Sequence, residues 1–318
     1  MRFLTNPSTD PWYNMSFDEY CLEQYPSDDN FFYLWRNRPS VIIGFNQNAF
    51  AEVNLGYLEE KGIALARRVT GGGAVYHDLQ NLNYTFVGRD LSPQPVVEAL
   101  RSLGVDAELT GRNDIFVAGR KVSGYARRVW RDREIIHGTL LYDVDLDTLA
   151  RALDVPGSKL AAKGIASVRS RVANLKDCLP QFASLDAFQA TLQEILTAGD
   201  AQLPFGEERR SVVQRLSEEK FSTWEWIYGQ SREADLVRSG RLPCGTVEVR
   251  MSLDRGVLRD LAFGGDFLGA LPADGLAARL TGLPFRREPL FSALQEAGVE
   301  RYFDDTGAEA LLALMLGS

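Results

Sequence analysis

The stretch Arg67-Arg68-Val69-Thr70-Gly71-Gly72-Gly73-Ala74-Val75-Tyr76-His77-Asp78 places two guanidinium groups directly before three consecutive glycines. Glycine reaches positive φ at little cost and lets a ligand approach bare backbone N–H groups. Such a loop beside arginine is a suitable anion site, although Gly-Gly is also a common signal for a tight turn between strands. The stretch lacks the Gly-Lys-Ser/Thr of a P-loop and the GxGxxG of a dinucleotide loop. Taken alone, it favours the turn.

Strand patterns surround this loop. Ile63–Val69 precedes it and Asn83–Val87 follows it, and further strands are predicted at Phe31–Trp35, Val41–Phe45, Asp114–Ala118, Lys121–Val129 and Glu134–Tyr142. Short polar turns join the last three strands, so the sheet is predicted to be mostly antiparallel rather than doubly wound. Helices are predicted from Pro11 to before Pro26 and at Pro95–Leu103, Leu146–Leu153, Leu185–Leu196 and Glu208–Glu218. These elements predict an α+β fold, with a mixed, mostly antiparallel sheet flanked by helices.

The pattern becomes irregular between Phe221 and Pro243, where we place a domain boundary near residues 230–243. Two strands, Thr246–Leu253 and Val257–Phe263, and three short helical stretches follow it. They are sufficient for a small α+β domain of about 80 residues. Residues 1–235 and 240–318 are therefore predicted to form two domains.

Composition excludes several classes of protein. A net charge of −8 over 318 residues argues against nucleic-acid binding. The three cysteines are far apart and outside any CxxC spacing, which is typical of a reducing compartment. No apolar run approaches the ~18 residues that span a membrane, and the N-terminus does not have the pattern of a signal peptide, so we expect a cytoplasmic protein. With only two histidines, a Cys₂His₂ zinc site is nearly excluded.

Three further segments depart from ordinary core patterning: Gly111–Ile115 (GRNDI), Gly119–Ala126 (GRKVSGYA) and His137–Leu141 (HGTLL). Each has an ordinary structural interpretation. Lys121 has the pattern of a solvated strand-edge lysine, Asn113-Asp114 that of a turn, and His137 that of a hydrogen-bonded core histidine.

Together with the glycine loop, Ala162–Leu175 (AKGIASVRSRVANL) and Trp224–Gly229 (WEWIYG), these segments closely resemble the lipoate–protein ligase A family. The motifs occur in the family's order, although Gln80 stands where related sequences commonly have glycine. The resemblance implies a catalytic domain related to biotin–protein ligase and a small C-terminal accessory domain. It also implies a reaction in two steps, in which lipoate and ATP give lipoyl-AMP and pyrophosphate, and a lysine of an apo lipoyl domain then takes the acyl group.

The resemblance also implies roles for individual residues. Lys121 would be the catalytic residue, reaching both the lipoyl carbonyl and the α-phosphate, where a cation stabilises developing negative charge. ATP would be held by Arg68, Gly73, Ala74, Val75, Tyr76, Asn113, Asp114 and Lys121, with Asp114 as a ligand of Mg²⁺. Lipoate would be held by Lys121, Gly72, His77, Trp35 and His137, although Trp35 is equally well explained as core packing. No zinc, nicotinamide or flavin is implied.

Two basic segments have alternative interpretations. Ser167–Arg171 is either a segment that closes over the adenylate or a solvated strand end. Arg127, Arg128, Arg131 and Arg133 form either a solvated turn or a docking patch for an acidic lipoyl domain. The partners implied are lipoyl domains of 2-oxoacid dehydrogenase E2 subunits and the glycine-cleavage H protein, bound by a monomer that contacts neither nucleic acid nor membrane.

Three other functions compete with lipoate ligation as explanations of these motifs. An ATP-independent lipoyl or octanoyl transferase of the same fold sometimes uses a catalytic cysteine, yet neither Cys21, Cys178 nor Cys244 lies in a motif. Biotin–protein ligase generally has a different glycine-loop sequence. A non-catalytic binding module is disfavoured because Lys121 and the glycines are intact.

Overall fold

The computed structural model describes the chain except for residues 48, 112, 154–170, 229–235, 255–256 and 317–318. Its main sheet has seven strands in the order β1-β2-β6-β10-β9-β8-β7. Their bounds are β1 Arg2–Phe3, β2 Phe31–Trp35, β6 Asn81–Gly88, β10 Arg133–Leu141, β9 Arg120–Trp130, β8 Asp114–Val117 and β7 Ala107–Thr110. Only β1 and β2 run parallel, and the other neighbours are antiparallel. The predicted fold class is confirmed.

Helices cover both faces of this sheet, because side chains alternate between the two faces of each strand. On β2, Phe32 and Leu34 pack into a core with α4 (Gln94–Ser102) and α7 (Leu185–Thr197). Phe31, Tyr33 and Trp35 belong to a second core, with α1 (Pro11–Glu23) and α8 (Glu207–Leu216).

A second, three-stranded sheet carries the glycine loop. Its order is β4-β3-β5, with bounds β4 Ala64–Arg67, β3 Ser40–Ile43 and β5 Val75–His77. The loop connects β4, which is parallel to β3, with β5, which is antiparallel to it. One side of this sheet packs against α3 (Leu55–Lys61), α5 (Leu146–Ala152) and α9 (Trp224–Ile227). The loop is therefore a strand-to-strand turn, as its glycines predict.

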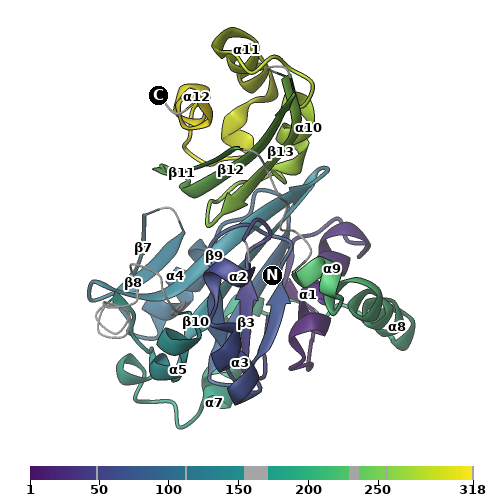
Figure 1. The fold of residues 1–318 in the computed structure, drawn as a ribbon. Helices are drawn as coiled ribbons and strands as arrows, with labels where there is room; N and C mark the ends of the chain where they lie inside the picture. The colour runs from purple at the N-terminus through teal and green to yellow at the C-terminus, as the bar shows by residue number, and fades with distance from the viewer. Residues whose placement is uncertain (48, 112, 154–170, 229–235, 255–256, 317–318) are drawn as a thin grey trace.

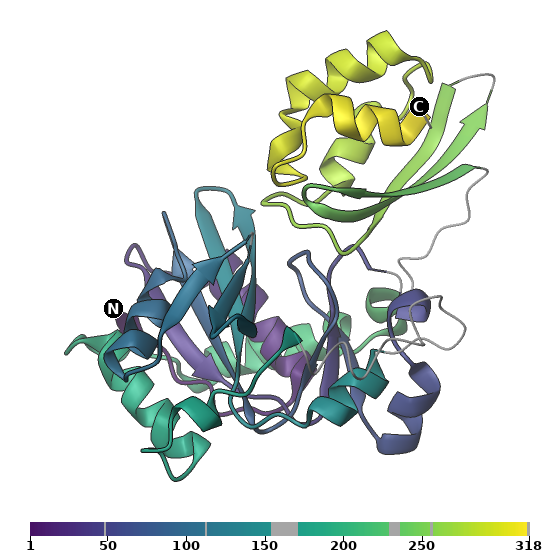
Figure 2. The ribbon, with the colours of Figure 1, turned by 90° about the vertical axis from the view of Figure 1, so that its left-hand side faces the viewer.

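The C-terminal part forms its own layer above the rest of the chain (Figures 1 and 2). Strands β11 (Leu236–Leu242), β12 (Gly245–Asp254) and β13 (Val257–Gly265) form an antiparallel sheet. Helices α10 (Asp274–Leu280), α11 (Arg287–Ala297) and α12 (Ala308–Leu316) pack on it around a separate hydrophobic core. Backbone hydrogen bonds join it to the larger part, among them that from Gly72 N to Phe267 O at 2.9 Å.

The sequence missed several short elements. The sequence patterns predicted only an apolar run at Val75–His77 and an irregular segment at Leu236–Leu242, where the structure has strands. They predicted no element at α2 (Ala49–Glu52) or α3. Each of these segments is short, so few periods were available to reveal a helix or a strand. Among the helices that the structure describes, none is long and apolar enough to cross a membrane.

Candidate functional site

A cavity of about 130 Å³ lies between the main sheet and the glycine loop. It brings together nearly all of the residues singled out from the sequence. Those that line it are Trp35, Arg68, Gly72, Gly73, Ala74, Val75, His77, Asn113, Lys121 and His137. Its wall also contains apolar groups that the sequence did not reveal, including Met15, Ile42 and Ala126. The cavity thus combines an apolar lining with a few cationic and amide groups.

The amine of Lys121 is positioned by an irregularity in its own strand. The pairing of β8 with β9 shifts between Ile115 and Phe116, and such bulges redirect side chains. Nζ of Lys121 lies 2.7 Å from Oδ1 of Asp114, and both side chains remain partly exposed. A Cβ atom on Gly124 would lie 2.9 Å from that amine. The bare backbone of Gly124 therefore provides the space in which the amine lies.

Asn113 and Asp114 are held by strand pairing. The amide of Asn113 donates to the carbonyl oxygen of Tyr125 at 2.8 Å, and the N–H of Tyr125 donates back to the carbonyl oxygen of Asn113 at 2.9 Å. Asp114 faces Gly124 in the register and is not part of the cavity lining, although it contacts Lys121. The turn predicted for Asn113-Asp114 is thus the start of a strand that carries the partner of Lys121.

Arg68 braces the glycine loop. Its Nη2 donates to the carbonyl oxygens of Gly71 and Gly73 at 2.6 and 2.9 Å, and its Nε donates to Oγ1 of Thr70 at 3.1 Å. Burial, with a smaller contribution from Arg67, lowers the pKa of this guanidinium to about 10. It therefore stays charged at neutral pH and places a positive charge at the cavity wall. Gly72 has φ of 90°, which favours glycine at this point of the loop.

Arg67, the neighbouring arginine, faces away from the cavity and is fully buried. It donates to the carbonyl oxygens of Gly44, Phe45, Gln47, Trp226 and Ile227. The indole N–H of Trp226 donates in return to the carbonyl oxygen of Arg67. Arg67 therefore holds Trp226 and Ile227, two residues of the Trp224–Gly229 motif, against the sheet. Of the two arginines in the opening stretch, only Arg68 reaches the site.

Alternation along β5 divides its side chains between two environments. Val75 and His77 line the cavity, whereas Tyr76 is buried in the core with Val41 and Leu58. Burial raises the pKa of the Tyr76 phenol. A role of Tyr76 at the cavity would therefore rest on its backbone.

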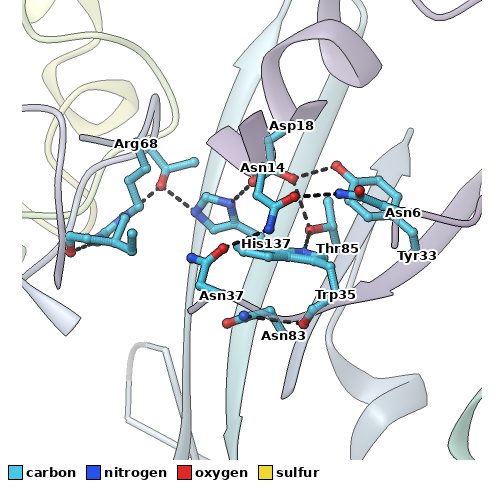
Figure 3. A network of polar contacts seen from close by, with 12 residues as sticks. Asn6, Asn14, Asp18, Tyr33, Trp35, Asn37, Arg68, Asn83, Thr85 and His137 are labelled. Atoms are coloured by element: carbon cyan, nitrogen blue, oxygen red, sulfur yellow. Dashed lines mark hydrogen bonds and ion pairs between the residues drawn. The ribbon is translucent and has the colours of Figure 1, made fainter. Parts of the chain in front are cut away.

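His137 is both a core histidine and part of the cavity wall. Its Nδ1 lies 2.6 Å from Oδ2 of Asp18, and its Nε2 lies 2.7 Å from Oγ1 of Thr70 (Figure 3). The other oxygen of Asp18 accepts hydrogen bonds from Tyr33 and Thr85. The order of groups matches a nucleophile–histidine–aspartate triad. However, Thr70 is 1% exposed and its hydroxyl oxygen already accepts a hydrogen bond from Arg68. This series of hydrogen bonds therefore orients His137 and Arg68 and does not supply a nucleophile.

His77 lies beside Trp35, with the two ring centroids 6.0 Å apart and the rings edge to face. Burial, followed by the charges of Arg68 and His137, lowers the pKa of His77 to about 3. The ring is therefore neutral at physiological pH. Trp35 donates its indole N–H to Oγ1 of Thr85 at 2.9 Å, which fixes the indole plane at the end of the cavity.

The arginine cluster that follows Lys121 is largely engaged within the molecule. Arg127 pairs with Glu134 at 2.7 Å, Arg128 pairs with Glu23 at 3.2 Å, and Arg133 donates to a backbone carbonyl. Two predicted features lie partly or wholly outside the described residues: the segment Ser167–Arg171, apart from Arg171, and the first part of the Ala162–Leu175 motif.

The cysteines and carboxylates do not form a reactive or metal-binding cluster in the described part of the chain. Cys21 and Cys244 are fully buried, Cys178 is exposed, and none of the three lines the cavity. Burial raises the pKa of the Cys21 thiol well above its usual range. Across the described ranges, no three His, Cys, Asp or Glu side chains are grouped as metal ligands.

Asp18, Asn37 and Thr70 contact the two histidines of the cavity but lie outside the motifs' predicted site residues. One signal was available for the first of these. Asn14 and Asp18 are four residues apart on a helix and therefore share a face, within a stretch of α1 that is buried throughout. A carboxylate on a buried helix face needs hydrogen-bond partners. Asp18 has three, Tyr33, Thr85 and His137, each on a different strand of the main sheet.

Comparisons with known proteins agree over almost the whole chain. Residues 10–197 match the family described as the lipoyl protein ligase A/B catalytic domain, and residues 231–315 match the bacterial lipoate protein ligase C-terminus. Lipoate-protein ligase LplJ of Bacillus subtilis is 36% identical over 330 residues, covering 99% of this chain and all of the relative.

Two solved structures extend the comparison. A bi-partite lipoate protein ligase of Thermoplasma acidophilum, studied with its E2 lipoyl domain, is 32% identical with a TM-score of 0.66, covering 74% of this chain and 98% of that one. Lipoate-protein ligase A bound with ATP is 31% identical with a TM-score of 0.62, covering 72% of this chain and 99% of that one.

Proposed function

Since the chain belongs to the lipoate–protein ligase family, we propose that it activates lipoate with ATP and transfers the lipoyl group to a lysine of an apo lipoyl domain. The observation that carries this proposal is the cavity in which the amine of Lys121 meets an apolar slot. Lipoate has a carboxylate at one end and an apolar tail. A site for it therefore needs a cation and an apolar wall together.

Lys121 is the catalytic residue of this proposal. A carboxylate and ATP repel one another, and a positive amine between them stabilises the negative charge that develops as the carboxylate oxygen attacks the α-phosphorus. The bond between the α-phosphorus and the bridging oxygen to the β-phosphate breaks, and pyrophosphate leaves with its electrons. The same amine lies near the acyl carbonyl when the acceptor lysine attacks the mixed anhydride. AMP then leaves with the electrons of the anhydride bond, and the acceptor nitrogen loses a proton. Thus Lys121 serves both half-reactions without a covalent enzyme intermediate.

The glycine loop and β8 surround this amine. We propose that Arg68 and the backbone from Gly73 to Tyr76 hold the nucleotide, with Asn113 and Asp114 opposite them. The electropositive, braced loop supports this assignment. Gly72, His77, Trp35 and His137 then line the part of the cavity that takes lipoate.

Magnesium would enter with ATP as part of the substrate. Mg²⁺ usually binds one or two carboxylates together with substrate phosphates, and Asp114 is the carboxylate beside Lys121. We propose that Asp114 would hold this ion, with the amine of Lys121 beside it. Mg²⁺ would neutralise phosphate charge there.

The acceptor class follows from the relatives, since the Thermoplasma ligase is described with its E2 lipoyl domain. We extend the proposal to E2 lipoyl domains and the glycine-cleavage H protein as acceptors of a cytoplasmic, monomeric enzyme. The proposed division is a catalytic part, residues 1–235, and an accessory part, residues 240–318. It is supported by the separate core above β11–β13.

The test uses the full chain with an apo lipoyl domain, lipoate and Mg·ATP. Intact-mass spectrometry should show one lipoyl group added to the acceptor, and nucleotide analysis should show ATP converted to AMP. Omitting ATP should abolish the mass shift. Equal modification without ATP would contradict the proposal and favour a transferase.

A further inference from the structure

His77 lies at the end of the cavity remote from Lys121. The cavity floor crosses strands β2, β6, β10 and β9, where Trp35 faces Asn83, and Asn83 faces Thr139. The N–H of Gly124 on β9 donates to Oγ1 of Thr139. Adjacent strands are about 4.8 Å apart, so the Trp35 end and the Lys121 end are separated by roughly 14 Å. An acid activated at Lys121 therefore extends its tail toward Trp35 and His77.

A chain of buried amides determines how His77 is protonated. It begins where the backbone N–H of Ser8 donates to Oδ1 of Asn6 at 3.2 Å, which identifies that atom as the oxygen. The amide nitrogen of Asn6 therefore donates to Oδ1 of Asn14, 2.9 Å away. Backbone groups have only one role in a hydrogen bond, so they fix the orientation of side-chain amides.

Asn14 continues the chain in the same direction. Its amide nitrogen donates to the carbonyl oxygens of Ser8 and Arg36 at 3.1 and 3.0 Å, and to Oδ1 of Asn37 at 2.7 Å (Figure 3). Asn37 therefore accepts through its oxygen and presents its nitrogen to Nδ1 of His77 at 3.0 Å.

His77 must then accept at Nδ1. A neutral imidazole that accepts at Nδ1 carries its proton on Nε2, and the lowered pKa of His77 agrees with a neutral ring. Asn37 does not line the cavity, whereas His77 does, so the Nδ1 edge faces away from it. Nε2 is buried and has no hydrogen-bond partner among the described residues. The ring that carries this unsatisfied donor therefore lines the tail end of the cavity.

We propose that His77, through Nε2–H, is a specificity-determining residue that selects acids carrying a hydrogen-bond acceptor near the tail end, such as the dithiolane sulfurs of lipoate, over purely alkyl acids. This inference rests on the proposed ligase function. An alkyl tail leaves the buried donor unsatisfied, whereas a sulfur atom pairs with it. Sulfur is a weak acceptor. The expected advantage is about fivefold in kcat/KM, which corresponds to about 1 kcal/mol.

The test compares lipoate with 5-cyclopentylpentanoate, which has the same ring size and chain length but no sulfur. The ratio of their kcat/KM values should fall about fivefold from the wild-type chain to His77→Leu. Differences in hydrophobicity between the two acids cancel in this comparison. Ser40→Ala is the matched control, since Ser40 pairs with His77 across β3 and β5 but does not line the cavity. It should keep the wild-type ratio.

An unchanged ratio in a folded His77→Leu variant would overturn the inference while leaving the ligase function intact. If the wild-type chain ligates neither acid, the proposed function itself fails, which is a different outcome.

A measurement on the wild-type chain covers the case in which His77→Leu does not fold. The chain has only two histidines, so ¹⁵N-detected imidazole spectra are readable. His77 should be protonated at Nε2 and unprotonated at Nδ1 between pH 6 and 8. Lipoate should shift the Nε2–H resonance, and the cyclopentyl acid should not shift it comparably. The opposite tautomer, or equal shifts with both acids, would contradict the inference.

Discussion

Nζ of Lys121 lies 2.7 Å from Oδ1 of Asp114, so the proposed catalytic amine is paired with a carboxylate before any substrate binds. The pair bridges β9 and β8 at a bulge. Since both side chains are partly exposed, the pair contributes little to the stability of the fold. Its importance lies in holding the amine at the cavity.

Replacing the amine should stop adenylate formation. Lys121→Met keeps the length of the side chain but removes the charge, so pyrophosphate release from lipoate and Mg·ATP should fall by about a hundredfold or more. The free energy of unfolding should change by less than about 1 kcal/mol. Pyrophosphate release near the wild-type rate would contradict the assigned role.

Removing the carboxylate tests the proposed contact with magnesium. Asp114→Asn keeps the shape of the side chain but removes its charge, so the Mg²⁺ concentration for half-maximal adenylation should rise several-fold. The measurement is a magnesium titration at fixed nucleotide. A lower rate with an unchanged magnesium dependence would show that Asp114 acts on Lys121 alone.

A single methyl group should displace the amine. Gly124→Ala places a Cβ atom 2.9 Å from Nζ of Lys121, and the flexible end of the lysine moves away at little cost in stability. We expect kcat to fall by about tenfold or more, because a small misplacement of a reacting group is expensive in rate. Ser123→Ala, on the neighbouring core-facing position, is the control and should retain activity. Wild-type activity of Gly124→Ala would contradict this placement of Lys121.

Arg67 should matter for stability rather than for chemistry. Arg67→Met removes the guanidinium hydrogen bonds to five carbonyl oxygens, and urea denaturation should show a loss of about 3 kcal/mol or more. Arg38→Met provides the control, because Arg38 forms a surface ion pair with Asp10 and should change stability by at most about 1 kcal/mol. A similar effect of both substitutions would show that the buried guanidinium does not tie these segments together.

The buried neutral His77 predicts acid sensitivity. Its pKa is about 3 in the folded chain, below the ordinary value of 6.5, so between these values the unfolded chain binds the proton more readily. Stability is therefore fully present above pH 6.5 and decreases as the pH falls toward 3, by up to about 1.4 kcal/mol per pH unit from this group. Urea denaturation at pH 7 and pH 4.5 should show a smaller loss for His77→Leu. Equal losses would contradict the lowered pKa.

Much of the architecture was accessible from local patterns. Short segments with β-branched and aromatic residues between polar turns predicted β2, β9 and β10, because a strand needs only its own few residues to give this signal. The order of the motifs around the glycine loop and Lys121 predicted the family and the residues that line the cavity. These are properties of segments a few residues long, which a sequence shows directly.

Only the tertiary structure decided which polar groups act in the site and how they are oriented. The adjacent residues Arg67 and Arg68 have different roles, because their guanidinium groups donate to carbonyl oxygens of different segments. Arg67 is structural, whereas Arg68 lines the cavity. Asp18 meets His137 across 119 positions of sequence, and the amide chain from Asn6 fixes the proton of His77. Burial and hydrogen-bond partners come from distant parts of the chain. Protonation, tautomer and charge in this cavity therefore depend on the complete fold.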